Sequence, residues 1–355
     1  MYHGPNDLRL EILPVPRISS GELLVKVAAC GICPTDIKKI QYGIVTPPRV
    51  FGHETAGTLV RVGALARGFQ AGDRVSLHHH VPCLKCYACR HRAFAQCDQY
   101  KRTGVTAGFE PAGGGYAEYV RVMPFVLPGV VKIPKRNSFL EGAMLEPVNT
   151  VLKAVRRLRL LPGDIVMVAG QGPIGLMFTR LLTIRGMHVL ATDLLESRLE
   201  LARGLGAKWT VARGSKDIGC VSRGGARGSL EMLVDRVTRG RGLDAAVLAV
   251  PSDDAMLEAQ SLLRGAGQIL LFSHTRRGSS TSVDLADICV DEKDLIGSYS
   301  ADFLLQNEVS RMVFSRKLDV RPLISRLFPL ADTAEAIRLA ANPTPSSLKL
   351  VVTQE

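Results

Sequence analysis

The chain has 355 residues and no long hydrophobic run. A membrane-spanning helix needs roughly 20 consecutive apolar residues, and the most apolar stretches here, such as residues 158–161 and 165–169, are far shorter. The first residues also lack the basic start and following apolar stretch of a secretory leader, and no segment repeats along the chain. We therefore expect a cytoplasmic protein without a membrane partner.

Acidic residues are in the minority, with 33 Asp and Glu against 45 Lys and Arg, which gives a formal net charge of +12. Such an excess can indicate a nucleic-acid partner. The basic residues are scattered, however, and are locally dense only in residues 85–92 and 213–241. We interpret the charge as an arginine-rich solvated surface and expect no nucleic-acid partner. A zinc-ribbon nucleic-acid-binding protein is the remote alternative, and strongly salt-dependent DNA binding would support it.

Hydrophobic residues make up 46% of the chain and charged residues 22%, which is a globular balance and excludes disordered and fibrous classes. The length suits two domains better than one core. Alternating, β-branched segments separated by glycines predict short strands and a β-rich, barrel-like first part. These segments are residues 21–29, 51–62, 72–76 and 115–122.

The pattern changes near Pro147. Apolar strands then alternate with helical patterns, which predicts a doubly wound parallel sheet and therefore an α/β fold. The expected strands are residues 165–169, 188–192, 245–250 and 268–272, and the expected helices are 149–160, 174–185, 197–205 and 254–263. After Gly297 the pattern is irregular, with one helix over 302–314 and a closing strand over 348–353. Residues 213–229, rich in Gly, Arg and Ser, predict a surface loop.

Four of the eight cysteines form a C-x2-C-x2-C-x7-C pattern within a short polar lobe at about residues 78–100. Disulfides are not expected in an intracellular chain. Four thiolates close together suit tetrahedral zinc, with Zn–S bonds of roughly 2.3 Å, and an iron–sulfur cluster is the competing interpretation. We favour a structural zinc, without an open coordination position, held by Cys83, Cys86, Cys89 and Cys97.

A second group of metal-ligand types is spread along the chain. The segment from Cys30 to Asp36 reads C-G-I-C-P-T-D, G-H-E follows at residues 52–54, and L-E-P stands at residues 145–147. A C-x-x-C pair alone could be redox-active. One thiolate, one imidazole and one or two carboxylates can instead hold zinc while leaving a position open for substrate. The run His78–His80 is a poorer candidate, since consecutive strand residues point to opposite faces.

A glycine-rich turn predicts a nucleotide site. Residues 166–175 read V-M-V-A-G-Q-G-P-I-G, a strand running into G-x-G-x-x-G and then a helix, and an acidic residue, Asp193, ends the next strand. Such a turn allows close backbone approach to a pyrophosphate, and the helix N-terminus offers N–H groups to it. The predicted contacts are Gly170, Gly172, Pro173, Ile174 and Gly175. Asp193 favours NAD over NADP because it would repel a 2′-phosphate, although Arg198 could help to tolerate one.

In order and spacing, these motifs resemble the zinc-containing medium-chain alcohol dehydrogenases, closest to the sorbitol and threonine dehydrogenases. The resemblance covers nearly the whole chain. It implies a GroES-like catalytic domain over residues 1–146, a Rossmann coenzyme domain over 147–296, and a C-terminal return over 297–355 that completes the catalytic domain. It also implies that the catalytic zinc and the nicotinamide lie in the cleft between the domains, and that the protein forms a homodimer or homotetramer.

The resemblance further implies two zinc ions per chain. Cys33 and His53 match the first two ligands of the catalytic zinc, and Glu146 matches the glutamate of the polyol branch. Glu54 either binds zinc directly or exchanges with the third ligand. Asp36 is expected to orient His53.

In the implied reaction, zinc polarises the substrate hydroxyl, Thr35 relays its proton, and hydride passes to the nicotinamide. This chain departs from many relatives at Lys38, where they carry a relay histidine. We expect a secondary alcohol of a polyol, cyclitol or similar compound as substrate, with L-threonine or simple alcohols as alternatives. The glycine-rich residues 106–115 are expected to line or gate the cleft.

Overall fold

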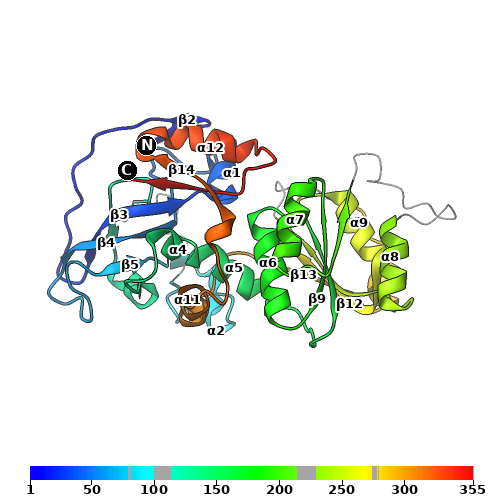
Figure 1. Cartoon of the computed structure of the whole chain (residues 1–355). Helices are drawn as coiled ribbons and strands as arrows, with labels where there is room; N and C mark the ends of the chain where they lie inside the picture. Colours follow the sequence, from blue (N-terminus) through cyan, green and yellow to red (C-terminus); the bar gives the residue numbers. More distant parts are fainter. Residues whose placement is uncertain (79–80, 100–112, 214–228, 274–277, 279, 355) are drawn as a thin grey trace. The chain divides into compact units, whose positions relative to one another are not determined.

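The computed structural model describes residues 1–78, 81–99, 113–213, 229–273, 278 and 280–354, and it separates into two compact units. Unit 1 comprises Met1–Thr150 and Ser300–Glu355, and unit 2 comprises Val151–Tyr299. Both chain termini therefore belong to unit 1, as the colour gradient of Figure 1 makes visible. Within the described part of the chain, no helix is both long and apolar enough to cross a bilayer.

Unit 1 is built on a sheet of seven strands in which the first and last parts of the chain are neighbours. The order along the sheet is β14-β15-β3-β4-β5-β7, and β6 also pairs with β3. The last strand, β15, runs antiparallel to β3, with Val352 opposite Cys30. The C-terminal return is therefore part of the core of this unit. The strand bounds are β3 (Leu23–Gly31), β4 (Glu54–Val62), β5 (Arg74–Ser76), β6 (Tyr119–Val122), β7 (Val131–Lys132), β14 (Ile324–Pro329) and β15 (Lys349–Thr353), with a separate hairpin of β1 (Tyr2–Gly4) and β2 (Asp7–Leu8).

Short helices of unit 1 begin and end at residues with a clear local cause. Helix α1 (Pro34–Tyr42) starts with proline in its first turn, where a missing N–H costs nothing, and it ends at Gly43, whose φ of 63° is left-handed. The start of α4 (Phe139–Ala143) is a capping box formed by Ser138 and Glu141. The other α-helices of unit 1 are α2 (Tyr87–Arg90), α11 (Gln306–Phe314) and α12 (Thr333–Ala341), and the 3-10 turns are η1 (Phe94–Gln96), η2 (Pro124–Gly129), η3 (Phe303–Leu305), η4 (Arg321–Leu323) and η5 (Leu330–Asp332). Helix α5 (Leu145–Val155) begins in unit 1 and ends in unit 2.

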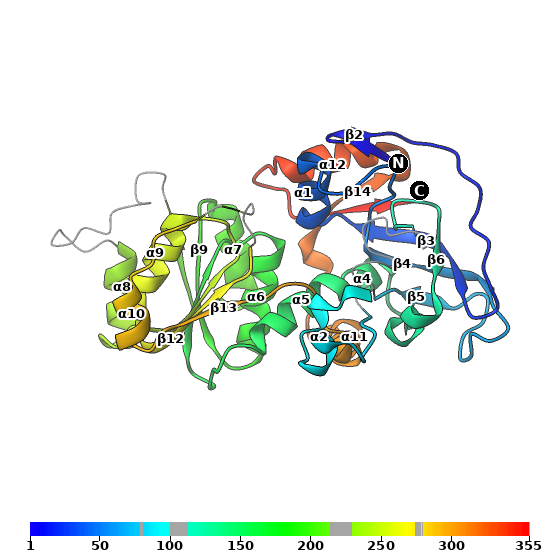
Figure 2. The same ribbon diagram turned by 180° about the vertical axis from the view of Figure 1, so that it is seen from behind.

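Unit 2 is a six-stranded sheet whose neighbouring strands are all parallel, in the order β10-β9-β8-β11-β12-β13. Numbered along the chain, this is the 3-2-1-4-5-6 order of a Rossmann fold. The two views place α6 and α7 on one face of the sheet and α8 and α9 on the other (Figures 1 and 2). The bounds are β8 (Ile165–Ala169), β9 (His188–Asp193), β10 (Trp209–Ala212), β11 (Leu243–Leu248), β12 (Leu263–Leu271), β13 (Asp294–Gly297), α6 (Pro173–Ile184), α7 (Glu196–Gly204), α8 (Ser229–Thr238), α9 (Asp253–Leu262) and α10 (Leu285–Val290).

The structure contains elements that the sequence pattern did not predict. Strand β10, helix α1, and β14 and α12 of the C-terminal return were all missed, and α8 begins at Ser229, inside the segment expected to be a loop. The helix expected over 149–160 is instead α5, which starts at Leu145 because proline is tolerated in the first turn of a helix. The rest of the expected loop, residues 214–228, lies outside the described residues.

Candidate active site

The four cysteines of the polar lobe converge on one point. Cys86 and Cys89 lie at the start and inside of α2, and Cys97 follows η1, so that two short turns bring distant sulfurs together. The four Sγ atoms all lie within 4.8 Å of one another, with 3.9 Å between Cys83 and Cys89 and 3.5 Å between Cys86 and Cys89. Tetrahedral zinc with four thiolates requires S–S distances of about 3.8 Å. The cluster therefore fits a structural zinc.

Backbone N–H groups prepare this cluster for negative charge. The amide of Cys86 donates to Cys83 Sγ at 3.4 Å, and the amide of Cys83 donates to Cys97 Sγ at 3.4 Å. A hydrogen bond from the backbone N–H of Lys85 is the largest of the contacts that lower the pKa of Cys83 to about 6. A thiolate is the form that binds metal.

A second cluster gathers Cys33, His53 and Glu54, whose ligand atoms lie within 4.8 Å of one another. Cys33 is the N-cap of α1, directly after β3, while His53 and Glu54 stand at the start of β4. The antiparallel pairing of β3 with β4, which sets Gly31 opposite Glu54, brings the two segments together. His53 and Glu54 are almost fully buried and Cys33 is partly buried.

Asp36 fixes one side of the His53 ring. Its Oδ1 lies 3.1 Å from His53 Nδ1, and Asp36 is completely buried in the first turn of α1. Burial alone would lower the pKa of His53, but the charges of Asp36 and Cys33 raise it well above the usual value. A carboxylate on Nδ1 is the arrangement that sets the tautomer of a metal-binding histidine and leaves Nε2 for the metal.

Glu54 has one satisfied and one unsatisfied carboxylate oxygen. Oε1 lies 2.5 Å from the ammonium group of Lys349, which also donates to the carbonyl of Ile32. Oε2 is buried and has no hydrogen-bond partner among the described residues. It lies so close to Gly31 that a Cβ there would be 1.9 Å away. A buried carboxylate oxygen without a partner, beside a thiol and an imidazole, fits a metal ligand.

Glu146 lies in the first turn of α5 and is buried, but its carboxylate is not part of the group that converges within 4.8 Å. Burial, with the charges of His53 and Glu54 acting on it in opposite directions, raises its pKa to about 7. Thr35 is partly buried in the first turn of α1. Lys38 lies on the same helix, and burial lowers its pKa.

The other candidates of the sequence take different places. Cys30 lies in the core with its Sγ 3.5 Å from Thr55 Oγ1, and burial raises its pKa to about 12, so it is unsuited to redox chemistry. His78 is buried and belongs to neither described cluster, while residues 79 and 80 lie outside the described part. Of the glycine-rich residues 106–115, only 113–115 are described.

In unit 2, the glycine turn leads from β8 directly into α6. Gly170 has a φ of 87°, and a Cβ there would lie 2.3 Å from Val250 Cγ1. A Cβ on Gly175 would lie 1.7 Å from the carbonyl oxygen of Gly170. Both positions therefore require glycine. Gly172 is the N-cap residue of α6, and Pro173 and Ile174 lie in the first turn of this helix. The unpaired backbone N–H groups at the N-terminus of α6 therefore follow directly after the glycine turn.

Asp193 ends β9 beside this turn. Its Oδ2 accepts from the backbone N–H of Gln171 at 2.5 Å, and its Oδ1 accepts from that of Leu195 at 2.9 Å. Arg198 approaches to 4.0 Å. The carboxylate is thereby held at the end of the strand next to the glycine turn, where an acidic residue of a dinucleotide-binding fold contacts a ribose.

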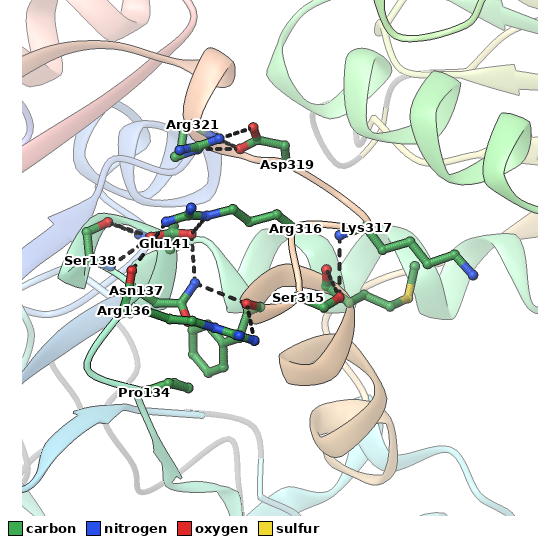
Figure 3. A network of polar contacts seen from close by, with 12 residues as sticks. Pro134, Arg136, Asn137, Ser138, Glu141, Ser315, Arg316, Lys317, Asp319 and Arg321 are labelled. Carbon is green, nitrogen blue, oxygen red and sulfur yellow. Dashed lines mark hydrogen bonds and ion pairs between the residues drawn. The ribbon is translucent and has the colours of Figure 1, made fainter.

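A polar network in unit 1 joins the segment before unit 2 to the segment after it (Figure 3). Glu141 accepts from the side chain of Asn137 at 2.8 Å and from that of Arg316 at 3.1 Å. Asn137 also donates to the carbonyl of Phe314 at 3.2 Å, across 177 positions of sequence. The network therefore secures the C-terminal return to the start of α4.

Two residues of the site, Lys349 and Tyr116, were not predicted from the sequence. Lys349 stands in a closing strand of apolar residues, and a charged residue in such a strand is a signal that it has a buried partner. Tyr116 donates from its hydroxyl to Asp36 Oδ2 at 3.2 Å, a contact over 80 positions. Nothing in the local sequence around either residue identifies the partner.

Comparisons with known proteins agree with both units. Residues 19–135 match the model of the alcohol dehydrogenase GroES-like domain, and residues 173–315 match that of zinc-binding dehydrogenases. Sorbitol dehydrogenase of Bos taurus is 30% identical over 347 residues, which covers 95% of this chain and 90% of that protein. L-idonate 5-dehydrogenase of Vitis vinifera is 30% identical over 351 residues, with 96% and 90% covered.

Among solved structures, an alcohol dehydrogenase from Thermus sp. ATN1 superimposes with a TM-score of 0.83 at 25% identity, covering 99% of this chain and 98% of the other. The chain belongs to the zinc-binding, medium-chain alcohol dehydrogenase family. It is therefore an oxidoreductase of the class that acts on CH–OH groups. The predicted fold class, a GroES-like unit with a Rossmann unit, is confirmed.

Proposed function

We propose that this protein oxidises a secondary alcohol of a polyol or a related polar compound with NAD, at a zinc site formed by Cys33, His53 and a glutamate. The observation that carries the proposal is the buried, unpartnered Oε2 of Glu54, which lies in one cluster with a thiol and an imidazole. Within the described residues, this is the one metal-ligand group besides the four cysteines.

Cys33 and His53 are the two fixed ligands in this proposal, and Glu54 or Glu146 completes the set. A bound zinc would act as a Lewis acid toward the alcohol oxygen, and bound NAD would accept the hydride. The chain's own residues orient the metal ligands and move the substrate proton. Asp36 holds the imidazole through Nδ1. Thr35 relays the substrate proton: its hydroxyl oxygen accepts that proton while the hydroxyl gives up its own proton to the next acceptor. The structural zinc belongs to Cys83, Cys86, Cys89 and Cys97.

Lys38 determines where that proton goes next. Lys38 replaces a relay histidine of many relatives. Burial lowers the pKa of Lys38, so its ammonium group gives up a proton more readily than that of an exposed lysine. The two relatives named above are, by their names, a sorbitol and an L-idonate dehydrogenase. Both substrates are polyhydroxylated, and this supports a polyol or similar substrate for this chain.

Unit 2 would bind the coenzyme, with the pyrophosphate at Gly170, Gly172 and Gly175. The carboxylate of Asp193 favours NAD, because it would accept hydrogen bonds from the ribose hydroxyls and repel a 2′-phosphate. Arg198, 4.0 Å from that carboxylate, would moderate the preference without reversing it. We further propose that residues 1–146 and 297–355 form the catalytic domain and residues 147–296 the coenzyme domain.

We also propose a cytoplasmic homodimer or homotetramer. Strand β13 is the last strand of the sheet in unit 2, and it exposes Leu295. Leu285 and Val290 of the adjacent α10 are both more than three-quarters exposed. A partner subunit would cover such apolar groups. Sedimentation equilibrium measures the oligomer directly, and a monomer at all concentrations would contradict this part of the proposal.

The reaction is tested by the appearance of NADH absorbance with purified protein, NAD, and a panel of simple alcohols, sugar polyols, cyclitols and L-threonine. Turnover concentrated on polyols or cyclitols is the expected result. Turnover of L-threonine or simple alcohols alone would overturn the substrate class. The same panel with NADP tests the coenzyme, for which slower reduction is expected.

A further inference from the structure

Tyr116 is a buried tyrosine whose hydroxyl group lies beside the charged groups of the second metal cluster. Its Oη lies 3.2 Å from Asp36 Oδ2 and 3.2 Å from the carbonyl oxygen of Gly31. A hydroxyl has one proton to donate, so these two acceptors compete for it. The carboxylate is the stronger acceptor because it is charged.

Asp36 receives this hydrogen bond on the oxygen that His53 does not use. Oδ1 faces Nδ1 of His53 at 3.1 Å, and Oδ2 faces Tyr116. The carboxylate has no solvent exposure. Its plane is therefore set by two side chains, one on each oxygen, and rotation about its terminal bond would break both contacts.

The backbone secures Tyr116 against the segment that carries His53. The amide of Tyr116 donates to the carbonyl of Phe51 at 2.9 Å, and the amide of Gly115 donates to that of Gly52 at 2.8 Å. A Cβ on Gly52 would lie 2.8 Å from the backbone nitrogen of Tyr116 and 2.9 Å from its ring carbon Cδ1. The glycine before His53 is thus needed for the close approach of this tyrosine.

We propose that Tyr116 is a positioning residue of the zinc site, whose hydroxyl group fixes the Asp36 carboxylate and, through it, the His53 imidazole. The inference rests on the proposed function, since it concerns the zinc held by Cys33 and His53. Hydrogen-bond partners behind a metal-binding histidine commonly change metal affinity by about 10–100-fold when they are removed. Tyr116 is one residue further from the metal, so we expect the lower end of that range.

The test is the rate at which a coloured chelator removes zinc from the Tyr116→Phe variant. This variant keeps the ring that packs on Gly52 and loses only the hydroxyl. Tyr119→Phe is the matched control, because Tyr119 makes no side-chain hydrogen bond with a described residue. A Cys33→Ser variant, which retains only the four-cysteine zinc, identifies which phase of zinc loss belongs to which site.

We expect the catalytic zinc of Tyr116→Phe to leave about tenfold faster, with the four-cysteine zinc and the Tyr119→Phe control unchanged. Adding Tyr116→Phe to Asp36→Asn should change the rate by less than about twofold, because the hydroxyl acts through Asp36. A merely structural tyrosine would lower the melting temperature of the zinc-loaded and zinc-free proteins equally. We expect the gap between those two melting temperatures to shrink.

An unchanged rate of zinc loss in Tyr116→Phe would overturn the inference, as would a tenfold effect that persists in the Asp36→Asn background. A Tyr116→Phe variant that does not fold would also overturn it, because the hydroxyl would then serve the fold. Wild-type protein with a single zinc per chain would instead refute the proposed function itself, so the two failures are distinguishable.

Discussion

Lys349 and Glu54 form an ion pair inside unit 1, with Nζ 2.5 Å from Oε1 and 295 positions of sequence between them. Both side chains are at most 5% exposed. Burial alone would lower the pKa of Lys349, but the charge of Glu54 and its hydrogen bond raise it overall. The pair ties the last strand of the chain to the residue beside His53, and it leaves Oε2 of Glu54 as the oxygen available to a metal.

Replacing Lys349 with methionine should therefore be strongly destabilising. The substitution leaves the Glu54 carboxylate buried without its counter-charge, and loss of one partner of a buried pair costs about 3–5 kcal/mol. Urea unfolding of the zinc-free protein measures the effect, because a zinc ion at Oε2 would itself be a counter-charge for Glu54. Lys132→Met, which breaks the more exposed pair with Asp73, is the control, with a loss of about 1 kcal/mol or less. Equal losses in the free energy of unfolding of the two variants would contradict a buried ion pair between Lys349 and Glu54.

The acid stability of unit 1 should depend on Glu141. Burial alone would raise the pKa of this carboxyl, but hydrogen bonds from Arg316, the Ser138 backbone and Asn137 lower it below its usual 4.5. A carboxyl whose pKa is lower in the folded state adds stability above the unfolded pKa. That contribution is lost as the pH falls below about 4.5 toward the folded pKa.

Glu141→Gln should therefore show a shallower decline of the free energy of unfolding below pH 4.5 than the wild type. Its stability near neutral pH should also be lower, because the interactions of the charged carboxylate are gone. Denaturant unfolding between about pH 3 and pH 7 measures both effects. Glu335→Gln, at an exposed position on α12, should follow the wild-type curve. A Glu141→Gln curve parallel to the wild type would refute the network's role.

Gly175 should tolerate no side chain. Alanine there would place Cβ 1.7 Å from the Gly170 carbonyl oxygen, so the turn or the start of α6 must shift. We expect Gly175→Ala to lower stability by about 1–3 kcal/mol and to weaken NAD binding at least about tenfold, since the same turn faces the pyrophosphate. Calorimetric titration with NAD and thermal unfolding are the measurements.

Gly204→Ala is the matched control for that substitution. Gly204 ends α7, and a Cβ there would meet no atom of another described segment within 4 Å. Alanine should leave NAD binding unchanged and raise stability by up to about 1 kcal/mol, because it restricts the unfolded chain. Similar losses in the two variants would show that the close approach of Gly175 to Gly170 is unimportant.

Asp193→Ser should shift the coenzyme preference toward NADP. The substitution removes the negative charge that would repel the 2′-phosphate and leaves Arg198 nearby. We expect the ratio of kcat/KM for NAD to that for NADP to fall at least about tenfold, or about 1.4 kcal/mol. Glu196→Gln, a charge change at an exposed position on α7, should leave the ratio unchanged. An unaltered ratio in Asp193→Ser would mean that another residue selects the coenzyme.

Residues that are close in sequence account for most of what could be predicted. The four-cysteine cluster, the glycine turn and the Cys33 to Asp36 segment are each contained in fewer than about twenty residues, so their spacing alone indicates their geometry. The parallel sheet of unit 2 was also evident, because buried parallel strands are continuous apolar runs. Helix α12 was missed although its start carries a sequence signal, with Asp332 as the N-cap residue and Glu335 three positions later.

Contacts between distant segments could not be predicted in this way. The partners of Glu54, Lys349 and Tyr116 are decided by the pairing of β15 with β3 and by the approach of residues 115–116 to residues 51–52. A single sequence does not encode such pairings in local spacing. Likewise, nothing in the motif L-E-P indicates that Glu146 lies outside the tight group that includes Glu54.

The most direct test of the account compares the wild type with Cys33→Ser for zinc per chain and for NADH formation with a polyol substrate. The account predicts two zinc ions per wild-type chain, one in the variant, and a loss of activity of at least about a thousandfold with the fold retained. Equal zinc content and equal turnover in the two proteins would contradict the zinc site at Cys33, His53 and Glu54.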